Sequence, residues 1–315
     1  MVKVGIVGGA GYTAGELLRI LINHPAVQVT QVVSESHPGE PVALVHEGLY
    51  GDTDLKFCDK LDINDLDVLF LCGAHGRSRE FWACNAAPAG LKVIDLAQDF
   101  RDQSDGYVYG LPEWQKERIK GADKVANPGC FATAIQLALL PLASAGLLNN
   151  DVEITAVTGS TGAGVKLGAT SHFSWRSGNM SAYKVFEHQH LLEINRNLKP
   201  GGELHFVPVR GDFTRGIFAT LHTACTLSLE EASALYEEYY KGQPFTFFFP
   251  GVADLKQVVN TNKCLISLEK HGGRLVITSV IDNLLKGASG QAVQNMNLML
   301  GLPEDTGLRL KALAF

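Results

Sequence analysis

Residues 2–21 read VKVGIVGGAGYTAGELLRIL. An apolar, β-branched run, Val2–Val7, leads directly into the glycine-rich turn 8–11, and leucines spaced for one buried face follow it. A strand, a tight turn and a helix in this order are typical of dinucleotide-binding domains, in which free N–H groups at the start of the helix face the phosphates. The stretch therefore predicts that the chain begins with a Rossmann-type unit.

The pattern continues through the next hundred residues. Further apolar strands are expected at 27–33, 67–72 and 92–96, with helical stretches between them. Continuous apolar strands separated by helices predict a parallel sheet that is covered on both faces. A strand end at 125–126 and a Pro128-Gly129 turn then lead into an apolar helix that starts near Cys130.

Beyond residue 150 the pattern changes. Helices are expected near 187–197 and 230–241, and strands at 153–157, 204–209, 217–227, 264–268 and 275–281. Many strands with few crossover helices predict a mostly antiparallel α+β domain. Apolar residues within 288–300 predict a last helix with one buried face. The expected fold is α/β plus α+β, with a first domain of 1–129 and 288–315 and a second domain of 130–287.

Composition limits the class of protein. The chain has 315 residues, of which 46% are hydrophobic and 19% charged, and a formal charge of −6. This excludes a disordered chain and a disulfide-stapled miniprotein. It contains no basic block and no apolar run of about 20 residues, so neither nucleic acid nor a membrane is expected as a partner. The start of the chain lacks the pattern of a signal peptide, and the expected location is cytoplasmic.

The glycine turn indicates which cofactor binds. Gly8 and Gly11 permit the close approach of phosphates, and the first helical residues Tyr12, Thr13 and Ala14 supply N–H groups. Ala14 stands where the GxGxxG pattern has its third glycine. At the tip of the second strand, Ser34 occupies the place where NAD enzymes usually carry an acidic residue. A hydroxyl binds a 2′-phosphate without repelling it, so the sequence favours NADP(H), although Glu35 follows.

One of the six cysteines stands apart. None forms a CxxC pair or a zinc-ligand spacing, and five are interpreted as small buried apolar residues. Cys130 ends the tetrad Asn127-Pro128-Gly129-Cys130 and falls in the first turn of a helix, where free N–H groups and the helix dipole stabilise a thiolate. A thiolate attacks activated acyl carbons and forms a thioester. The alternative is a capping cysteine packed in the core.

Five segments of the chain carry a resemblance to a known family. They are GGAGYTAGELLRIL (8–21), DLAQDFR (95–101), NPGCFAT (127–133), HQHLLEI (188–194) and DNLLKGASGQAVQNMNLMLGL (282–302). Together they resemble the N-acetyl-γ-glutamyl-phosphate reductases of the aspartate-semialdehyde dehydrogenase-like group. The resemblance implies NADPH-dependent reduction of that acyl phosphate to the semialdehyde, release of phosphate, Cys130 as the nucleophile, and a homodimer or homotetramer.

Acyl-phosphate reduction also needs an acid, and histidine suits this role. His188 and His190 are the candidates, and the sequence does not decide between them. In a strand the two would share a face, and in a helix they would point about 200° apart. A zinc pair is the rival interpretation, but no third ligand follows and no metal is expected. Glu193 is placed among the candidate substrate-binding residues. Its side chain is expected either to orient an imidazole or to face solvent.

The resemblance suggests further contacts. Arg101 falls where related dehydrogenases hold the leaving phosphate, and its alternative is a surface ion pair. Arg215 is a candidate for the substrate α-carboxylate, and Asn127 is placed on the substrate side. The candidate cofactor contacts outside the glycine turn and the Ser34 tip are His75, Gly76, Gly162, Asn283 and Gln291. Asn283 is equally plausible as a side chain that joins the domains.

Two kinds of alternative stay open. Sister reductases act on aspartyl phosphate or on N-acetyl-aminoadipyl phosphate, and the latter share these segments. A non-catalytic regulator would keep the fold and bind NADPH, but it would not oxidise a semialdehyde in the presence of phosphate.

Overall fold

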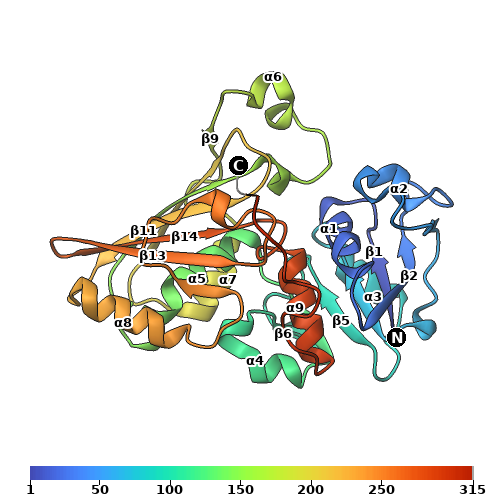
Figure 1. Cartoon of the computed structure of the whole chain (residues 1–315), viewed down its shortest axis with the longest axis horizontal. Coiled ribbons are helices and arrows are strands. Elements are labelled where there is room, and N and C mark those ends of the chain that lie inside the picture. The colour runs from blue at the N-terminus through green and yellow to red at the C-terminus, as the bar shows by residue number, and fades with distance from the viewer. Residues whose placement is uncertain (314–315) are drawn as a thin grey trace. The chain divides into compact units, whose positions relative to one another are not determined.

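The computed structural model describes residues 1–313, and this part of the chain divides into two compact units (Figure 1). The first comprises Met1–Pro128 and Ala288–Arg309. The second comprises Gly129–Gly287 and the described residues from Leu310 onward. The predicted domains differ from these units at residue 129 and after residue 309. Asn260 Nδ2 donates a hydrogen bond to the Lys311 carbonyl at 3.0 Å, which ties Lys311 to the second unit. Residues 314–315 of the predicted first domain lie outside the described residues.

The first unit contains a parallel sheet with the strand order β3-β2-β1-β4-β5-β7-β6. The strands are β1 (Val2–Val7), β2 (Val27–Val33), β3 (Phe57–Cys58), β4 (Val68–Leu71), β5 (Lys92–Asp95), β6 (Val108–Tyr109) and β7 (Lys124–Ala126). The predicted parallel sheet is confirmed. The strand order reverses direction between β1 and β4, and ligands of such sheets bind outside the carboxyl ends of the strands at this point.

Helices make both faces of this sheet internal, and all four residues of β4 are buried. The α-helices of the unit are α1 (Tyr12–Leu21), α2 (Val42–Val45), α3 (Arg77–Cys84), α4 (Pro112–Lys120) and α9 (Ser289–Met299). Short 3-10 helices are η1 (Glu47–Leu49), η2 (Ile63–Asp65) and η3 (Ser104–Gly106). Among residues 1–313, no helix is long and apolar enough to cross a bilayer.

Helix α9 departs from its prediction. All of its residues are buried, including the polar Gln291 and Asn295, so the prediction of one buried face is wrong. It packs against α1, α4 and β5. Asn295 donates to the Gly110 carbonyl at 2.9 Å and to the Asn127 side chain at 3.0 Å. Polar residues enter this core because other segments supply their hydrogen-bond partners.

Asp95, at the end of β5, is a buried carboxyl group. One of its oxygens, Oδ1, accepts hydrogen bonds from Ser78 Oγ and the Ala97 N–H, both at 2.8 Å. The other, Oδ2, is buried without a hydrogen-bond partner among residues 1–313. Burial raises the pKa of Asp95 to about 6, from an ordinary value of 3.8. The folded state therefore holds a proton that the unfolded chain releases, and folding stability falls as the pH rises from about 4 to above 6.

We expect Asp95→Asn to remove this pH dependence, because an amide oxygen can accept both hydrogen bonds and carries no charge. The free energy of unfolding of the variant minus that of wild type should increase by up to about 3 kcal/mol when the pH is raised from 4 to 7.5. Urea unfolding at both pH values measures the gain, and Asp54→Asn, at an exposed position, is the matched control. If the difference in the free energy of unfolding between variant and wild type stayed constant with pH, the raised pKa of Asp95 would be contradicted.

The second unit contains a mixed sheet with the order β12-β13-β14-β11-β8-β10-β9. The strands are β8 (Val152–Thr158), β9 (Ser181–Ala182), β10 (Leu204–Arg210), β11 (Ile217–Ala224), β12 (Thr246–Phe248), β13 (Cys264–His271) and β14 (Arg274–Ile281). The pairs β12/β13 and β8/β10 are parallel, and the other neighbours are antiparallel. The prediction of a mostly antiparallel α+β unit is confirmed.

Three helices lie on one side of this sheet (Figure 1). They are α5 (Cys130–Ser144), α7 (His190–Leu198) and α8 (Leu229–Tyr239). Alternate residues of β11 are buried beneath them, and the residues between these stay half-exposed on the other face. A fourth helix, α6 (Phe173–Arg176), lies in the excursion between β8 and β9 together with η4 (Ser160–Ala163) and η5 (Ala169–Ser171). The short η6 (Leu255–Gln257) precedes β13.

Helix α5 carries a proline in its interior. Pro141 has no N–H to donate to the Leu137 carbonyl four residues earlier. The hydroxyl of Tyr240 donates to that carbonyl instead, and the hydroxyl of Tyr236 donates to the Ala138 carbonyl at 2.6 Å. Two tyrosines that follow one another by a helical turn thus complete the hydrogen bonding of the proline-containing turn.

Tyr240→Phe is expected to lower the free energy of unfolding by about 1–3 kcal/mol, because it leaves the buried Leu137 carbonyl without this donor. Chemical denaturation measures the loss, and Tyr50→Phe, at an exposed position, is the control. Equal stability of the two variants would show that the Tyr240 hydroxyl contributes nothing to α5.

Candidate functional site

The turn between β1 and α1 fits a dinucleotide phosphate. Gly8 adopts a φ of 82°, and a Cβ at this position would lie 2.9 Å from the carbonyl carbon and oxygen of Cys72, at the end of β4. No side chain among the described residues caps α1, whose N-cap is Gly11. The N–H groups of Tyr12, Thr13 and the residue that follows them are therefore presented at the start of the helix, as a bound anion requires.

Beside this turn lies a cavity of about 510 Å³. Gly8 and Gly11 line it together with Ser34, at the tip of β2. Ser34 is buried, and its Oγ lies 3.2 Å from Ser36 Oγ. The cavity combines the glycine turn with hydroxyl groups at the end of β2, which is the arrangement that the adenosine half of NADP(H) requires. Arg77, at the start of α3, also lines this cavity, and the sequence analysis did not find it.

The remaining cofactor candidates of this unit occupy different positions. His75 and Gly76 lie in the loop after β4, where His75 Nδ1 accepts a hydrogen bond from the Gln98 N–H at 3.2 Å. Gly76 has a φ of 89° and donates its N–H to Asp99. Gln291 is fully buried within α9. The loop therefore places His75 and Gly76 near the carboxyl end of β4. Helix α9 places Gln291 in the core of the unit.

In the second unit, Cys130 is the first residue of α5, as predicted, and it is half-buried. Two glycines make room around it. A Cβ on Gly129 would lie 2.2 Å from Nε2 of His190, and a Cβ on Gly287 would lie 2.9 Å from the Cβ of Cys130. The imidazole of His190 therefore rests on the backbone immediately before the cysteine.

The two histidines are brought together by a segment that is neither a strand nor a single helix. His190 begins α7 and His188 precedes it, and their ring centroids are 4.6 Å apart. His188 Nδ1 accepts the His190 N–H at 3.2 Å. Burial, helped by the positive charges of Lys184 and Arg210, lowers the pKa of His188 to about 4. His188 is therefore neutral at pH 7.

Glu193 belongs to the same cluster. Its Oε2 accepts the Gly129 N–H at 3.2 Å, and its Oε1 lies 4.0 Å from His190 Nε2. The side chain is buried, which excludes the solvent-facing alternative. The Gly129-Cys130 turn (the cysteine turn), the His190 imidazole and the Glu193 carboxylate thus form one cluster at the start of α5.

Two predicted substrate residues have bonds to the protein itself. In the first unit Arg101 is buried, and it donates from Nε to the Asn127 carbonyl at 2.9 Å and from Nη2 to the Leu96 carbonyl at 3.0 Å. Asn127 donates to the Ala288 carbonyl at 3.0 Å and accepts from Asn295. Both side chains fix the backbone that leads into the cysteine turn. The surface ion pair considered for Arg101 is excluded by its burial.

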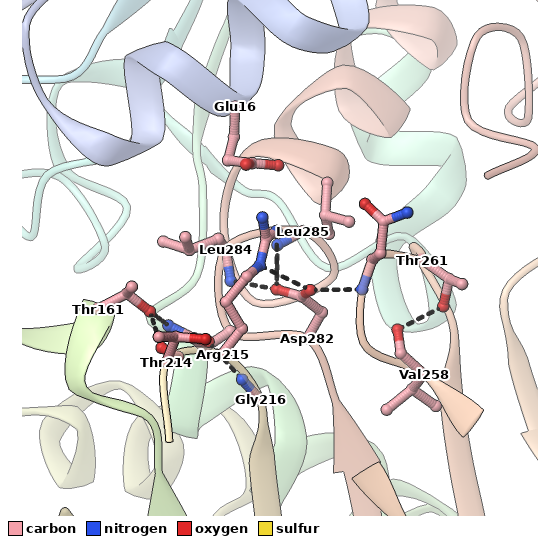
Figure 2. A network of polar contacts seen from close by, with 12 residues as sticks. Glu16, Thr161, Thr214, Arg215, Gly216, Val258, Thr261, Asp282, Leu284 and Leu285 are labelled. Atoms are coloured by element: carbon pink, nitrogen blue, oxygen red, sulfur yellow. Dashed lines mark hydrogen bonds and ion pairs between the residues drawn. The ribbon is translucent and has the colours of Figure 1, made fainter. Parts of the chain in front are cut away.

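Figure 2 shows the network of polar contacts that includes Arg215 and Asp282. Arg215 pairs with the buried Asp282 through Nε to Oδ2 at 3.1 Å and Nη2 to Oδ1 at 3.2 Å. Asn283 accepts the Gly216 N–H at 2.7 Å and donates to Thr161 Oγ1 at 3.0 Å. Gly162 follows Thr161 in η4. Asn283 therefore holds the loop that carries the predicted Gly162 turn, whereas the Arg215 side chain is paired with Asp282.

Comparisons with known proteins identify the family of this chain. The family model described as "Semialdehyde dehydrogenase, NAD binding domain" matches residues 3–122, and "Semialdehyde dehydrogenase, dimerisation domain" matches 130–283. Curated proteins named N-acetyl-gamma-glutamyl-phosphate reductase from Phocaeicola vulgatus and Bacteroides fragilis are 57% and 58% identical, over 100% of this chain and 100% of theirs. A protein of the same name from Flavobacterium johnsoniae is 56% identical, again with full coverage of both.

The chain belongs to the N-acetyl-γ-glutamyl-phosphate reductase family.

Solved structures support the fold of this family member. An aspartate semialdehyde dehydrogenase II from Vibrio cholerae has a TM-score of 0.76 at 17% identity, covering 96% of this chain and 98% of that one. An aspartate semialdehyde dehydrogenase with NADP from Candida albicans has a TM-score of 0.73 at 14% identity, covering 95% and 98%. The predicted fold class, a parallel-sheet unit followed by a mixed-sheet unit, is confirmed.

Around the cysteine of this reductase family member lie two residues that the sequence analysis missed. Arg210 is the last residue of β10, and its guanidinium lies 4.6 Å from the centre of the Tyr183 ring. Burial raises the pKa of Tyr183 to about 12, and Cys130 acts in the same direction. Because Arg210 also lowers the pKa of His188, both residues share the surroundings of the nucleophile. The only sequence feature that could have pointed to these two residues is the position of Arg210 at the end of a strand.

Proposed function

We propose that this chain catalyses the NADPH-dependent reduction of N-acetyl-γ-glutamyl phosphate to N-acetylglutamate semialdehyde, with release of phosphate, as a step of arginine biosynthesis. The observation that carries the proposal is full-length identity of 56–58% to proteins named as this reductase. Cys130 at the start of a helix and His190 on the adjacent backbone provide the groups that the chemistry needs.

Cys130 is the proposed nucleophile. Its thiolate attacks the acyl carbon, a C–S bond forms, the C–O bond to phosphate breaks, and phosphate leaves. The N–H groups at the start of α5 stabilise the thiolate and the oxyanion that develops beside it. NADPH, when bound at the glycine turn and the Ser34 cavity, supplies the hydride that reduces the thioester. Collapse of the resulting hemithioacetal regenerates the Cys130 thiolate and releases the aldehyde.

His190 is the proposed acid that protonates the hemithioacetal oxygen and takes the proton back as the aldehyde leaves. Its ring lies on Gly129, next to the nucleophile, and the Glu193 carboxylate lies within 4.0 Å of it. His188 is a poor acid, because a pKa of about 4 leaves roughly one molecule in 10³ protonated at pH 7. We assign His188 and Glu193 as positioning residues for the His190 segment and the Gly129 N–H.

For Arg101, Asn127 and Arg215 we propose positioning roles in place of direct substrate contact. The donors of Arg101 and Asn127 hold the backbone before the cysteine turn. Arg215 is paired with a buried carboxylate. The positive charge of Arg210, which acts on His188 and Tyr183, is the proposed source of attraction for the anionic substrate in the second unit.

The matched dimerisation domain supports an oligomer, and we propose a homodimer formed through the second unit. The half-exposed face of its sheet is the candidate contact surface. Light scattering of the purified chain should give twice the monomer mass of 34.0 kDa or a multiple of it. A mass equal to one chain at micromolar concentration would contradict this.

A panel of semialdehydes tests the activity in the reverse direction, with NADP⁺ and phosphate. We expect phosphate-dependent NADPH formation with N-acetylglutamate semialdehyde, and a kcat/KM at least about 10-fold lower with the one-carbon-longer N-acetylaminoadipate semialdehyde. Aspartate semialdehyde should be poorer still. Equal turnover of the longer substrate would overturn the specificity. NADPH binding without any phosphate-dependent turnover would favour the non-catalytic regulator.

A further inference from the structure

Two oppositely charged side chains meet at the wall of the Ser34 cavity in the first unit. Glu35 follows the tip of β2, and Arg77 begins α3. Arg77 Nη2 lies 2.6 Å from Glu35 Oε1, and both residues line the cavity together with Ser34 and Ser36. An acidic residue near this strand end is the feature by which NAD enzymes bind the ribose 2′-hydroxyl and repel a 2′-phosphate. Glu35 alone would therefore oppose NADP(H).

We propose that Arg77 determines the choice of cofactor. In the free protein it neutralises Glu35, and when NADPH binds its guanidinium leaves Glu35 and pairs with the 2′-phosphate, to which Ser34 and Ser36 offer hydroxyl groups. This inference rests on the proposed use of NADPH. It predicts that Arg77 changes the strand tip from one that selects NAD(H) into one that selects NADP(H).

The exposure of the ion pair allows this exchange. The side chains of Arg77 and Glu35 are 51% and 82% exposed, and exposed ion pairs contribute only about 0–1 kcal/mol. A guanidinium binds phosphate oxygens through charge-assisted hydrogen bonds, each roughly twice as strong as a neutral one. Replacing the carboxylate by the phosphate is therefore favourable.

A second carboxylate keeps Arg77 in place during the exchange. Glu80, one turn later in α3, accepts a hydrogen bond from Arg77 Nη1 at 3.0 Å and also lines the cavity. Since Nη1 contacts Glu80 and Nη2 contacts Glu35, release of Glu35 leaves the guanidinium anchored at the cavity wall. The nitrogen that Glu35 gives up is then available to the 2′-phosphate.

The same helix offers a matched control. Arg79 has the same charge and a similar exposure of 50%, and lies two residues further along α3. Its donors contact the Asp99 carbonyl at 2.8 Å, Ser104 Oγ at 3.1 Å and Asp105 at 3.4 Å. Removal of Arg79 therefore changes the net charge of α3 by the same amount as removal of Arg77, without touching the Glu35 pair.

The test compares calorimetric binding of 2′,5′-ADP and 5′-AMP to the full chain and to its variants. Arg77→Gln should weaken 2′,5′-ADP binding by about 10-fold or more while changing 5′-AMP binding less than about 3-fold. Glu35→Gln should strengthen 2′,5′-ADP binding by about 3-fold or more, and Arg79→Gln should change neither ligand by more than about 2-fold. Retained 5′-AMP binding shows that each variant is folded.

Equal losses in Arg77→Gln and Arg79→Gln would overturn the proposal, since they would reflect net charge alone. Equal losses of both nucleotides in Arg77→Gln would also overturn it, because the effect would not concern the 2′-phosphate. These measurements use no acyl substrate. Failure here with intact reductase activity therefore counts against Arg77 alone, and a selective loss of 2′,5′-ADP binding in a chain without reductase activity would count against the proposed function alone.

Discussion

Cys130→Ser is expected to abolish turnover, with kcat reduced on the order of 10⁴-fold or more, while NADPH binding stays within a factor of about two. The serine hydroxyl has nearly the size of the thiol, but its far higher pKa leaves almost no anion at neutral pH, even at the start of α5. Initial rates in the reverse direction and NADPH fluorescence titration measure the two quantities.

The matched control for this variant is Cys225→Ser, since Cys225 is also half-buried but follows β11 rather than beginning a helix. It should keep the wild-type rate. A Cys130→Ser variant with an unchanged rate would rule out thioester catalysis, and loss of NADPH binding in that variant would indicate damage to the fold instead.

His190→Gln is expected to lower kcat by about 10²–10⁴-fold, because a glutamine amide can occupy the place of Nε2 but cannot transfer a proton. His188→Asn should lower kcat by less than about 10-fold, since an asparagine Oδ1 can replace Nδ1 as the acceptor of the His190 N–H. The two variants therefore separate the proton donor from the residue that positions it.

The pH profile of kcat gives a readout that a structural role would not move. The limb that reports the acid should vanish in His190→Gln and persist in His188→Asn. His205→Gln, on the sheet of the same unit, serves as a control for the loss of an imidazole. The acid would be assigned to His188 instead if His188→Asn lowered kcat as much as His190→Gln does and also lost this limb of the pH profile.

Much of the fold follows from local sequence patterns. The ranges of β1 and β2 and the start of α5 agree with the predictions, because valine-rich stretches and an apolar helix bounded by glycine or proline specify them. Strands β6, β9 and β12 span only two or three residues, which is too short for any periodicity to be visible. The buried polar face of α9 was missed because its partners, such as the Gly110 carbonyl, come from distant segments.

The site was predictable where local geometry creates the chemistry. Cys130 was found because a thiol at a helix start has a local physical meaning. Arg215 shows the limit, since the fork of a guanidinium matches a substrate carboxylate and the Asp282 side chain equally well, and only the fold shows which one is present. Arg77 and Arg210 escaped for the same reason, because an arginine in isolation carries no signal of the cavity or imidazole beside it.

In the proposed reaction Cys130 carries the acyl group during turnover. This is tested most directly by mass spectrometry of an acid-quenched reaction with N-acetylglutamate semialdehyde and NADP⁺ in the absence of phosphate. Under these conditions the acyl-enzyme has no phosphate acceptor. We expect the N-acetylglutamyl mass on the peptide that contains Cys130, formed together with up to one NADPH per chain and lost when phosphate is added. NADPH formation that needs phosphate from the first turnover, with every Cys130 peptide unmodified, would contradict the account.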